Sequence, residues 1–408
     1  MGQSFAQEDV QDLPVPVNPL RRRLESIDIL RGLLMILMAI DHSRDFFTYL
    51  PPSFDPTDPA RSWPALFLTR WVTHLCAPGF IALAGVSVYL QRRGGKTAAQ
   101  MERLLLTRGL WLCFLEITVI SFGWSFALAP GLQVIWAIGI SMMFLGLLQR
   151  LPVAVVGAIG AVIVVGHNLL DGVKDTQFGA SGIWWDLLHH PAPLIVHGQM
   201  VGFEMYPVVP WVGVICLGYW FGRVAGWGVE RRERAAAGLG AVFLAAFCVL
   251  RVGHGYGDAI EFGRTGSTER TAMSFLEVTK YPPSLDYLLA TLGVILLAYA
   301  GIDWAVRQGW GKRVRGVVEV YGRVPFFYYV LHIYLIHALA LAVTAYEGLN
   351  WRFWTVPGSV FIRHLPGWGF GLGVVYLVWF LVVAGLYLPC VWFGRVKARR
   401  RDWWLSYL

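Results

Sequence analysis

His42 is a candidate catalytic group because it lies within an apolar stretch, 27–48, that is long enough to cross a membrane. An ionisable side chain at mid-depth in a membrane span costs at least about 2.5–3.5 kcal/mol, so it needs a structural or a functional reason. A neutral imidazole can take a proton from an attacking nucleophile. Asp41 precedes His42 and Asp45 follows it by about one helical turn, so we expect one of these carboxylates to orient the imidazole.

Two other apolar stretches place polar side chains near the depth of His42. Arg70 and His74 lie toward the outer end of the second stretch, and His332 follows Tyr328 by about one helical turn in the ninth. Three helices therefore bring imidazoles to one layer. We predict a site with His42, Asp45, Asp41, His74 and Arg70 as catalytic residues and with Tyr328 and His332 beside the substrate.

His332 and His337 cannot both face this layer, because five residues correspond to about 140° around a helix. We expect one of the two to be a packing residue. A histidine cluster can also bind a metal. However, no carboxylate–histidine spacing such as HExxH accompanies these histidines, and we expect no metal.

Asp28 and Arg31 lie at the opposite end of the first stretch and share one face of a helix. His42 is about 16 Å farther along that helix at 1.5 Å per residue. Two interpretations of the Asp28–Arg31 pair remain open: a structural ion pair at the membrane surface, or a group that holds the phosphates of a cytoplasmic ligand.

The amino-acid composition indicates the class of protein, and therefore the kind of secondary structure, that must position these residues. The 408 residues are 56% hydrophobic and only 15% charged, with a mean hydropathy of +0.54, whereas a soluble domain carries about 25% charged residues. A soluble multidomain enzyme, a disordered chain and a disulfide scaffold are therefore excluded. The net charge of +8 does not indicate nucleic-acid binding, because excess Lys and Arg in a membrane protein mark its cytoplasmic loops.

The sequence predicts an all-α polytopic membrane bundle of about ten transmembrane helices. Most of the 34 lysines and arginines fall in alternate loops, so both termini are predicted to be cytoplasmic. The predicted spans are 27–48, 65–90, 107–128, 131–149, 152–170, 206–225, 234–252, 284–303, 320–344 and 370–393. We divide the chain into a polar cytoplasmic tail (1–24), one transmembrane domain (25–395) and a basic, aromatic interfacial segment (396–408).

Three long outer segments are predicted between these spans: 171–205, 253–283 and 345–369. They contain tryptophans such as Trp184 and Trp354, which we interpret mainly as an aromatic belt at the headgroup level. A lid over an outward-facing site is the alternative. Whether the last segment re-enters the membrane is left open.

Four stretches carry a pattern with a known counterpart. They are Arg23–Gly32 followed by Asp41 and His42, Asp55–Asp58, Thr69–Pro78 followed by Gly85, and Lys280–Leu285. Together they resemble the heparan-alpha-glucosaminide N-acetyltransferase catalytic family, and in particular its bacterial branch. The first stretch also resembles the opening of the wider class of transmembrane acyltransferases.

The resemblance implies a multi-pass acetyltransferase of the bacterial inner membrane. In the family, cytoplasmic acetyl-CoA donates its acetyl group to an amino sugar on the far side. The lysosomal relatives use an Asn at the end of the first span and a His in the following loop. His42 matches the Asn position, but no histidine lies between His42 and His74 to match the second residue.

The residues themselves fit acyl transfer from a thioester. The reaction needs a base for the acceptor's proton; His42 can supply it or can itself carry the acyl group, and both roles are left open. Donors for the oxyanion are available in Arg70, His74 and Tyr328. We assign Arg31 and Asp28 to acetyl-CoA binding, and Asp55 and Asp58 to the acceptor.

Two rival functions remain. A proton-coupled or solute transporter would use the polar layer as a path, although no Gly- or Pro-broken spans recur at matching positions. A non-catalytic assembly subunit would fill that layer with packed side chains. The expected partners are the lipid bilayer, acetyl-CoA and a glycan or amino-sugar acceptor; a homodimer is left open.

Overall fold

The computed structural model describes residues 25–127, 129–196, 199–400 and 402. Within them, eight helical stretches are long and apolar enough to cross a membrane. Helices suit this environment because they satisfy their own backbone hydrogen bonds. The eight stretches are α2 (Pro64–Thr73) with α3 (Cys76–Arg93), α4 (Ala98–Leu115) with η2 (Glu116–Ile120) and α5 (Ser121–Ser125), α7 (Val153–Gly166) with η3 (His167–Leu170), α9 (Val208–Ala225), α10 (Val229–Gly253), α12 (Leu285–Arg307), α14 (Pro325–Tyr346) and α16 (Leu372–Arg399).

Two more helices complete the bundle. Helix α1 (Glu25–Phe47) is 23 residues long but rich in charge, and α6 (Val134–Leu148) is an apolar helix of 15 residues. With these two, the bundle has a helix for each of the ten predicted spans. The predicted all-helical membrane bundle is confirmed.

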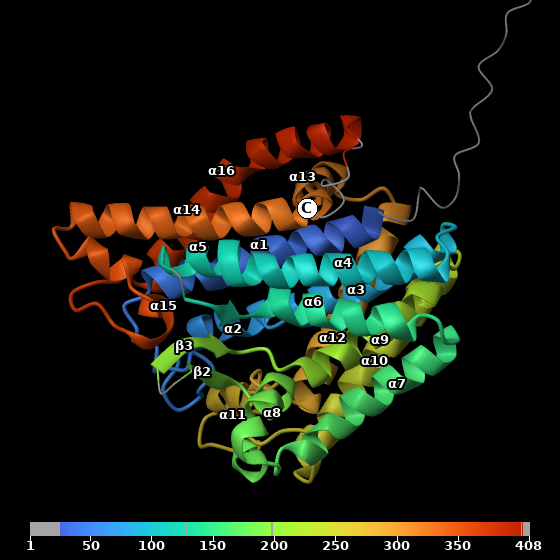
Figure 1. Cartoon of the computed structure of the whole chain (residues 1–408), viewed down its shortest axis with the longest axis horizontal. Coiled ribbons are helices and arrows are strands. Elements are labelled where there is room, and N and C mark those ends of the chain that lie inside the picture. The colour runs from blue at the N-terminus through green and yellow to red at the C-terminus, as the bar shows by residue number, and fades with distance from the viewer. Residues whose placement is uncertain (1–24, 128, 197–198, 401, 403–408) are drawn as a thin grey trace, which may run out of the picture.

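Helix α1 lies inside the bundle, packed against α3, α12, α14 and α16 (Figure 1). A short amphipathic helix, α13 (Lys312–Arg323), crosses its first half at very close range. Two glycines permit this approach: a Cβ on Gly322 would lie 1.8 Å from the carbonyl oxygen of Asp28, and one on Gly32 would lie 2.1 Å from that of Val318. The crossing fixes the start of α1, where Asp28 and Arg31 are found.

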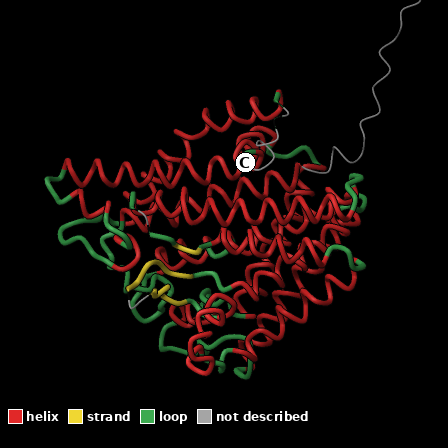
Figure 2. Tube along the Cα trace, in the orientation of Figure 1, coloured by secondary structure: helices red, strands yellow, loops and turns green. Residues whose placement is uncertain are grey.

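Irregular structure and a small sheet gather at the end of the bundle where α1 finishes (Figure 2). The sheet has the order β1-β3-β2, with β1 parallel and β2 antiparallel to β3. The outer segment 171–205 contains a β-hairpin whose second strand pairs with residues just before α6. The remaining elements are β1 (Gly131–Leu132), β2 (Ala192–Val196), β3 (Gln199–Glu204), η4 (Asp175–Ser181), α8 (Gly182–His189), α11 (Thr268–Leu276), η5 (Trp351–Thr355) and α15 (Ser359–Ile362).

The segment between α14 and α16 covers the end of α1. Its helices η5 and α15 have five and four residues, too few to cross a membrane. Trp354 is 2% exposed and donates to the hydroxyl of Thr344 at 2.7 Å, and the Trp368 indole donates to the carbonyl of Phe46 at 3.0 Å. Interpreting Trp354 as part of an aromatic belt was therefore wrong, because its side chain is buried in the protein.

The predicted tail, residues 1–24, lies outside the described residues, as does most of the predicted interfacial segment 396–408. Helix α16 continues through Arg399, so the first residues of that segment belong to the last transmembrane helix. The division of the chain into these three parts stays a prediction.

The α1–α13 crossing gives a stability prediction. Gly322→Ala places a methyl group against the backbone of α1, and we expect a loss of about 1–3 kcal/mol, the usual effect of overpacking. Gly316→Ala is the control, because a Cβ at Gly316 of the same helix meets open space. Thermal unfolding of the detergent-solubilised protein, followed by tryptophan fluorescence, measures both. Equal melting temperatures for the two variants would contradict the close crossing.

Candidate functional site

Three cavities follow one another along α1. We call them the basic-side cavity (about 360 Å³), the central cavity (about 140 Å³) and the far-side cavity (about 340 Å³). Phe80, Val134 and Tyr329 line both the basic-side and the central cavity, while Arg70 and Tyr281 line both the central and the far-side cavity. Neighbouring cavities therefore share part of their walls, and His42 lines the smallest of the three, the central cavity.

The imidazole of His42 is held by a second histidine. His42 Nδ1 lies 2.7 Å from His332 Nε2, the two rings are stacked at 4.9 Å, and Trp124 contacts His42 edge-on at 4.8 Å. His332 is fully buried, and its Nδ1 lies 3.0 Å from the carbonyl oxygen of Tyr328.

These contacts determine the tautomers of the neutral pair. A carbonyl oxygen only accepts, so His332 Nδ1 carries a proton and donates it to Tyr328. His332 Nε2 then has a lone pair and accepts from His42 Nδ1. His42 Nε2 is left with its own lone pair, in a side chain that lines the central cavity. This chain of hydrogen bonds leaves His42 Nε2 able to accept a proton, so His42 can act as a base.

The carboxylates beside His42 bind arginines instead of the imidazole. Arg44 donates to Asp41 at 2.9 Å and to Asp45 at 2.7 Å, and Arg70 also donates to Asp41. The expectation that Asp45 or Asp41 orients His42 is therefore wrong. The spacing permits that contact, but the neighbouring arginines bind both carboxylates, and His332 occupies the orienting position.

Positive charge exceeds negative charge around the central cavity. Its lining contains Arg44, Arg70 and Lys280 but only two carboxylates, Asp41 and Asp45. Tyr281, in the loop before α12, responds to this excess. Burial acts to raise the pKa of its phenol, but Lys280, Arg70 and a hydrogen bond with Tyr206 together outweigh burial, and the pKa lies below its usual value.

Helix α6 begins at the central cavity, where Gln133 and Val134 line the wall. Its first turn is capped by a residue from another helix. The Glu116 carboxylate, in the π-helical turn η2, accepts from the backbone N–H of Trp136 at 2.9 Å. A carboxyl oxygen at this position satisfies an otherwise unpaired N–H group of the helix. Glu116 thereby fixes one wall of the cavity.

The basic-side cavity is rich in cations. Arg31 donates to Asp28 at 2.9 Å and to the carbonyl of Gly322 at 3.1 Å, so the predicted ion pair is present. This pair lies on the cavity wall, where Asp28 is the one acidic residue among the described residues of the lining. The cationic lining residues are Arg31, Arg108, Arg323 and Lys397.

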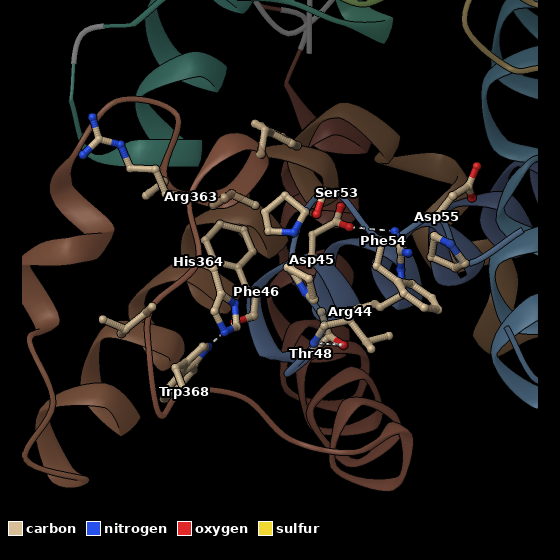
Figure 3. A pocket seen from close by; sticks show the side chains of 18 of the residues that line it. Arg44, Asp45, Phe46, Thr48, Ser53, Phe54, Asp55, Arg363, His364 and Trp368 are labelled. Carbon is tan, nitrogen blue, oxygen red and sulfur yellow. Dashed lines mark hydrogen bonds and ion pairs between the residues drawn. The ribbon is translucent and has the colours of Figure 1, made fainter. Parts of the chain in front are cut away.

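The far-side cavity lies between the end of α1, the loop that follows it, and the segment before α16 (Figure 3). Two arginines, Arg44 and Arg70, line both this cavity and the central one. The other acidic and basic lining residues are Asp45, Asp55, Arg363 and His364. Asp55 accepts from the backbone N–H of Thr57 at 2.7 Å, which shapes the turn after α1. Such a mixture of donors and acceptors suits a polar ligand.

Besides His332, which reaches the site through its contact with His42, three predicted site residues lie outside the linings of these cavities. Tyr328 is fully buried, with its ring stacked on His332, and it acts through its backbone carbonyl. His74 is buried against Tyr287, whose hydroxyl donates to the His74 carbonyl at 2.8 Å. Asp58 accepts from the N–H of Ala60 in a turn. We therefore withdraw Tyr328 and His74 as oxyanion donors, and Asp58 as an acceptor ligand.

His337 is the packing histidine of its pair, as expected for one of the two. Its ring nitrogens lie 2.8 Å from the carbonyl of Gly123 and 3.1 Å from that of Trp354. Among the residues that the structure describes, no group of three or more His, Cys, Asp or Glu side chains could hold a metal ion.

Several cavity residues were missed by sequence reasoning. Gln133, Lys280 and Tyr281 reach the central cavity from outside the spans that carry the histidines. Lys280 and Tyr281 lie in one of the four stretches noted for their resemblance to a family, which was the available signal. Arg108 and Lys397 were counted only among the basic residues of the cytoplasmic loops.

One comparison with known proteins found a match. Residues 23–251, more than half of the chain, match the family model described as heparan-alpha-glucosaminide N-acetyltransferase, catalytic. The matched region includes His42, Arg31 and Arg70 and ends before Lys280 and His332. The search of the curated proteins found no match.

Proposed function

Because the chain belongs to the heparan-alpha-glucosaminide N-acetyltransferase catalytic family, we propose that it transfers an acetyl group from acetyl-CoA to an amino sugar or other glycan across the membrane. The observation that carries this proposal is that His42 lines the small central cavity, which lies between two larger ones. Donor and acceptor can then approach one base from opposite ends of the bundle.

The donor binds in the basic-side cavity. CoA carries several phosphate charges, and Arg31, Arg108, Arg323 and Lys397 supply cations on that wall. Guanidinium groups bind phosphates through short, charge-assisted hydrogen bonds. Lys and Arg loops mark the cytoplasmic side of a membrane protein, so this side faces the cytoplasm, where acetyl-CoA is made. The membrane is then the bacterial inner membrane, with both termini cytoplasmic.

His42 acts as the general base. Its Nε2 takes the proton of the acceptor amine as the nitrogen lone pair attacks the thioester carbonyl carbon. The tetrahedral intermediate then collapses and releases CoA as the thiolate. The His42 imidazolium still donates its Nδ1–H to His332 Nε2. Phe80 and Tyr329 separate the reacting layer from the basic-side cavity and limit access of water to the thioester.

The acceptor binds in the far-side cavity. Its polar and aromatic lining, with Asp45, Asp55, Arg363 and Trp368, is of the kind that binds sugar hydroxyl groups. Arg70 and Tyr281 connect this cavity with the central one, so a bound amino group can extend toward His42.

Radiolabelled acetyl-CoA and glucosamine, added on opposite sides of proteoliposomes, test the proposal directly. We expect labelled N-acetylglucosamine on the acceptor side and free CoA on the donor side. Label retained by the wild-type protein without an acceptor, and lost in His42→Ala, would show that His42 carries the acetyl group. If CoA does not bind and no labelled product or protein forms, the proposal is wrong. Solute uptake that needs no acetyl-CoA would instead support a transporter.

The donor site predicts a charge effect on CoA affinity. Arg31→Ala removes one guanidinium from the basic-side cavity, and we expect CoA to bind about ten- to a hundredfold more weakly, because a charged hydrogen bond contributes about 1.5–3 kcal/mol. Calorimetric titration with CoA measures the Kd. Arg363→Ala, in the far-side cavity, is the matched control and keeps the wild-type Kd. Equal weakening by both substitutions would contradict the assignment.

The histidine pair predicts an effect on rate without an effect on donor binding. His332→Phe removes the acceptor for His42 Nδ1–H, and we expect kcat to fall about 10²–10⁴-fold with the Kd for CoA unchanged. His332→Gln should recover part of the rate, because its amide oxygen can accept the same hydrogen bond. The control is His337→Gln, outside the site. A His332→Phe enzyme with wild-type kcat would exclude the proposed role.

A further inference from the structure

Lys280 is a cationic residue that has no role in the reaction as proposed above. It lies in the loop between α11 and α12 and lines the central cavity with His42. The loop is firmly held on both sides of the residue. Asp258 accepts from the backbone N–H of Thr279 at 2.8 Å and from its hydroxyl at 2.6 Å, and it also accepts from the hydroxyl of Ser284 at 2.5 Å. The position of Lys280 is therefore determined by the fold.

The ammonium group of Lys280 differs from its cationic neighbours. Arg44 binds Asp41 and Asp45, and Arg70 binds Asp41. Among the described residues, by contrast, no carboxylate lies within ion-pair distance of Lys280, whose ammonium lies 5.1 Å from the ring centre of Tyr281. Its charge still acts on Asp41, His42 and Cys76 around the cavity. Among the described residues, the lining of the central cavity thus has one positive charge without an ion-pair partner, on the same cavity as His42.

We propose that the Lys280 ammonium is a catalytic group that stabilises the oxyanion formed at the acetyl carbonyl. This assignment rests on the proposed acetyl transfer. As the acceptor nitrogen attacks the carbonyl carbon, the C=O π electrons move to oxygen and His42 Nε2 takes the amine proton. The ammonium balances the new negative charge until the C–O double bond re-forms and the C–S bond breaks. Lys280 neither gains nor loses a proton in this step.

The physical basis is preorganisation. A charge fixed in a small, poorly solvated cavity interacts with a developing charge far more strongly than it would in water. Two arginines are less suited to this role, because carboxylates already balance their guanidinium groups. Before reaction the thioester carbonyl is neutral, so the gain from Lys280 comes mainly in the transition state, where it accelerates the chemical step.

The test compares Lys280→Met with wild-type protein in the acetyl-CoA and glucosamine assay. We expect kcat to fall about 10²–10³-fold, as on removal of one oxyanion donor, with the Kd for CoA and the KM for glucosamine changed less than about threefold. Unchanged kcat, or a higher KM for glucosamine at constant kcat, would overturn the assignment. The second result would place Lys280 in acceptor binding.

Chemical rescue separates loss of the charge from a folding defect. Lys280→Cys, alkylated with 2-bromoethylamine, regains an ammonium group at almost the same reach, and we expect it to recover most of the lost kcat. Wild-type protein treated in the same way is the control, because Cys248 is exposed. Alkylated protein that binds CoA but stays as slow as the untreated variant would contradict the proposal. A wild-type protein without transfer activity would instead contradict the proposed function itself.

Discussion

The charged side chains of α1 constrain the whole bundle. Asp28, Arg31, Asp41, Arg44 and Asp45 lie on one helix of 23 residues, and each would cost at least about 2.5–3.5 kcal/mol at mid-depth in hydrocarbon. The helix is therefore surrounded by α3, α12, α14 and α16 and crossed by α13. The three cavities lie along α1 because its charged side chains need polar surroundings. The placement of this helix thus determines where chemistry can occur in the protein.

The histidine pair and the neighbouring carboxylates have different roles in this site: a histidine orients the base, and the carboxylates bind arginines. A backbone carbonyl on α14 orients His332, and His332 orients His42, so the base is positioned without a carboxylate hydrogen-bonded to its imidazole. The carboxylates Asp41 and Asp45 are then available to hold Arg44 and Arg70. A neutral orienting chain also leaves His42 Nε2 as an acceptor, whereas a doubly protonated pair would place two like charges in contact.

Sequence reasoning was reliable where the signal is local. Apolar length predicted the ten helices, and the three-residue spacing predicted the Asp28–Arg31 pair. It was wrong about the partner of His42, because spacing along α1 cannot reveal His332, which lies 290 residues away on α14. Lys280 was missed for a related reason: a loop residue reaches the cavity only through the packing of α11 and α12 around it. Local patterns predict elements, while the site depends on contacts between distant segments.

The size of the central cavity restricts what can pass through it. Pockets that bind whole small molecules have volumes of about 300–1,000 Å³, a range that includes the basic-side and far-side cavities. The central cavity, at about 140 Å³, is too small for CoA or for a sugar. It has room for a two-carbon acyl group between Phe80 and Tyr329 on one side and Arg70 and Tyr281 on the other. In the proposed reaction the acetyl group therefore crosses this layer while both carriers stay on their own sides, so the bundle can remain closed to solutes during transfer.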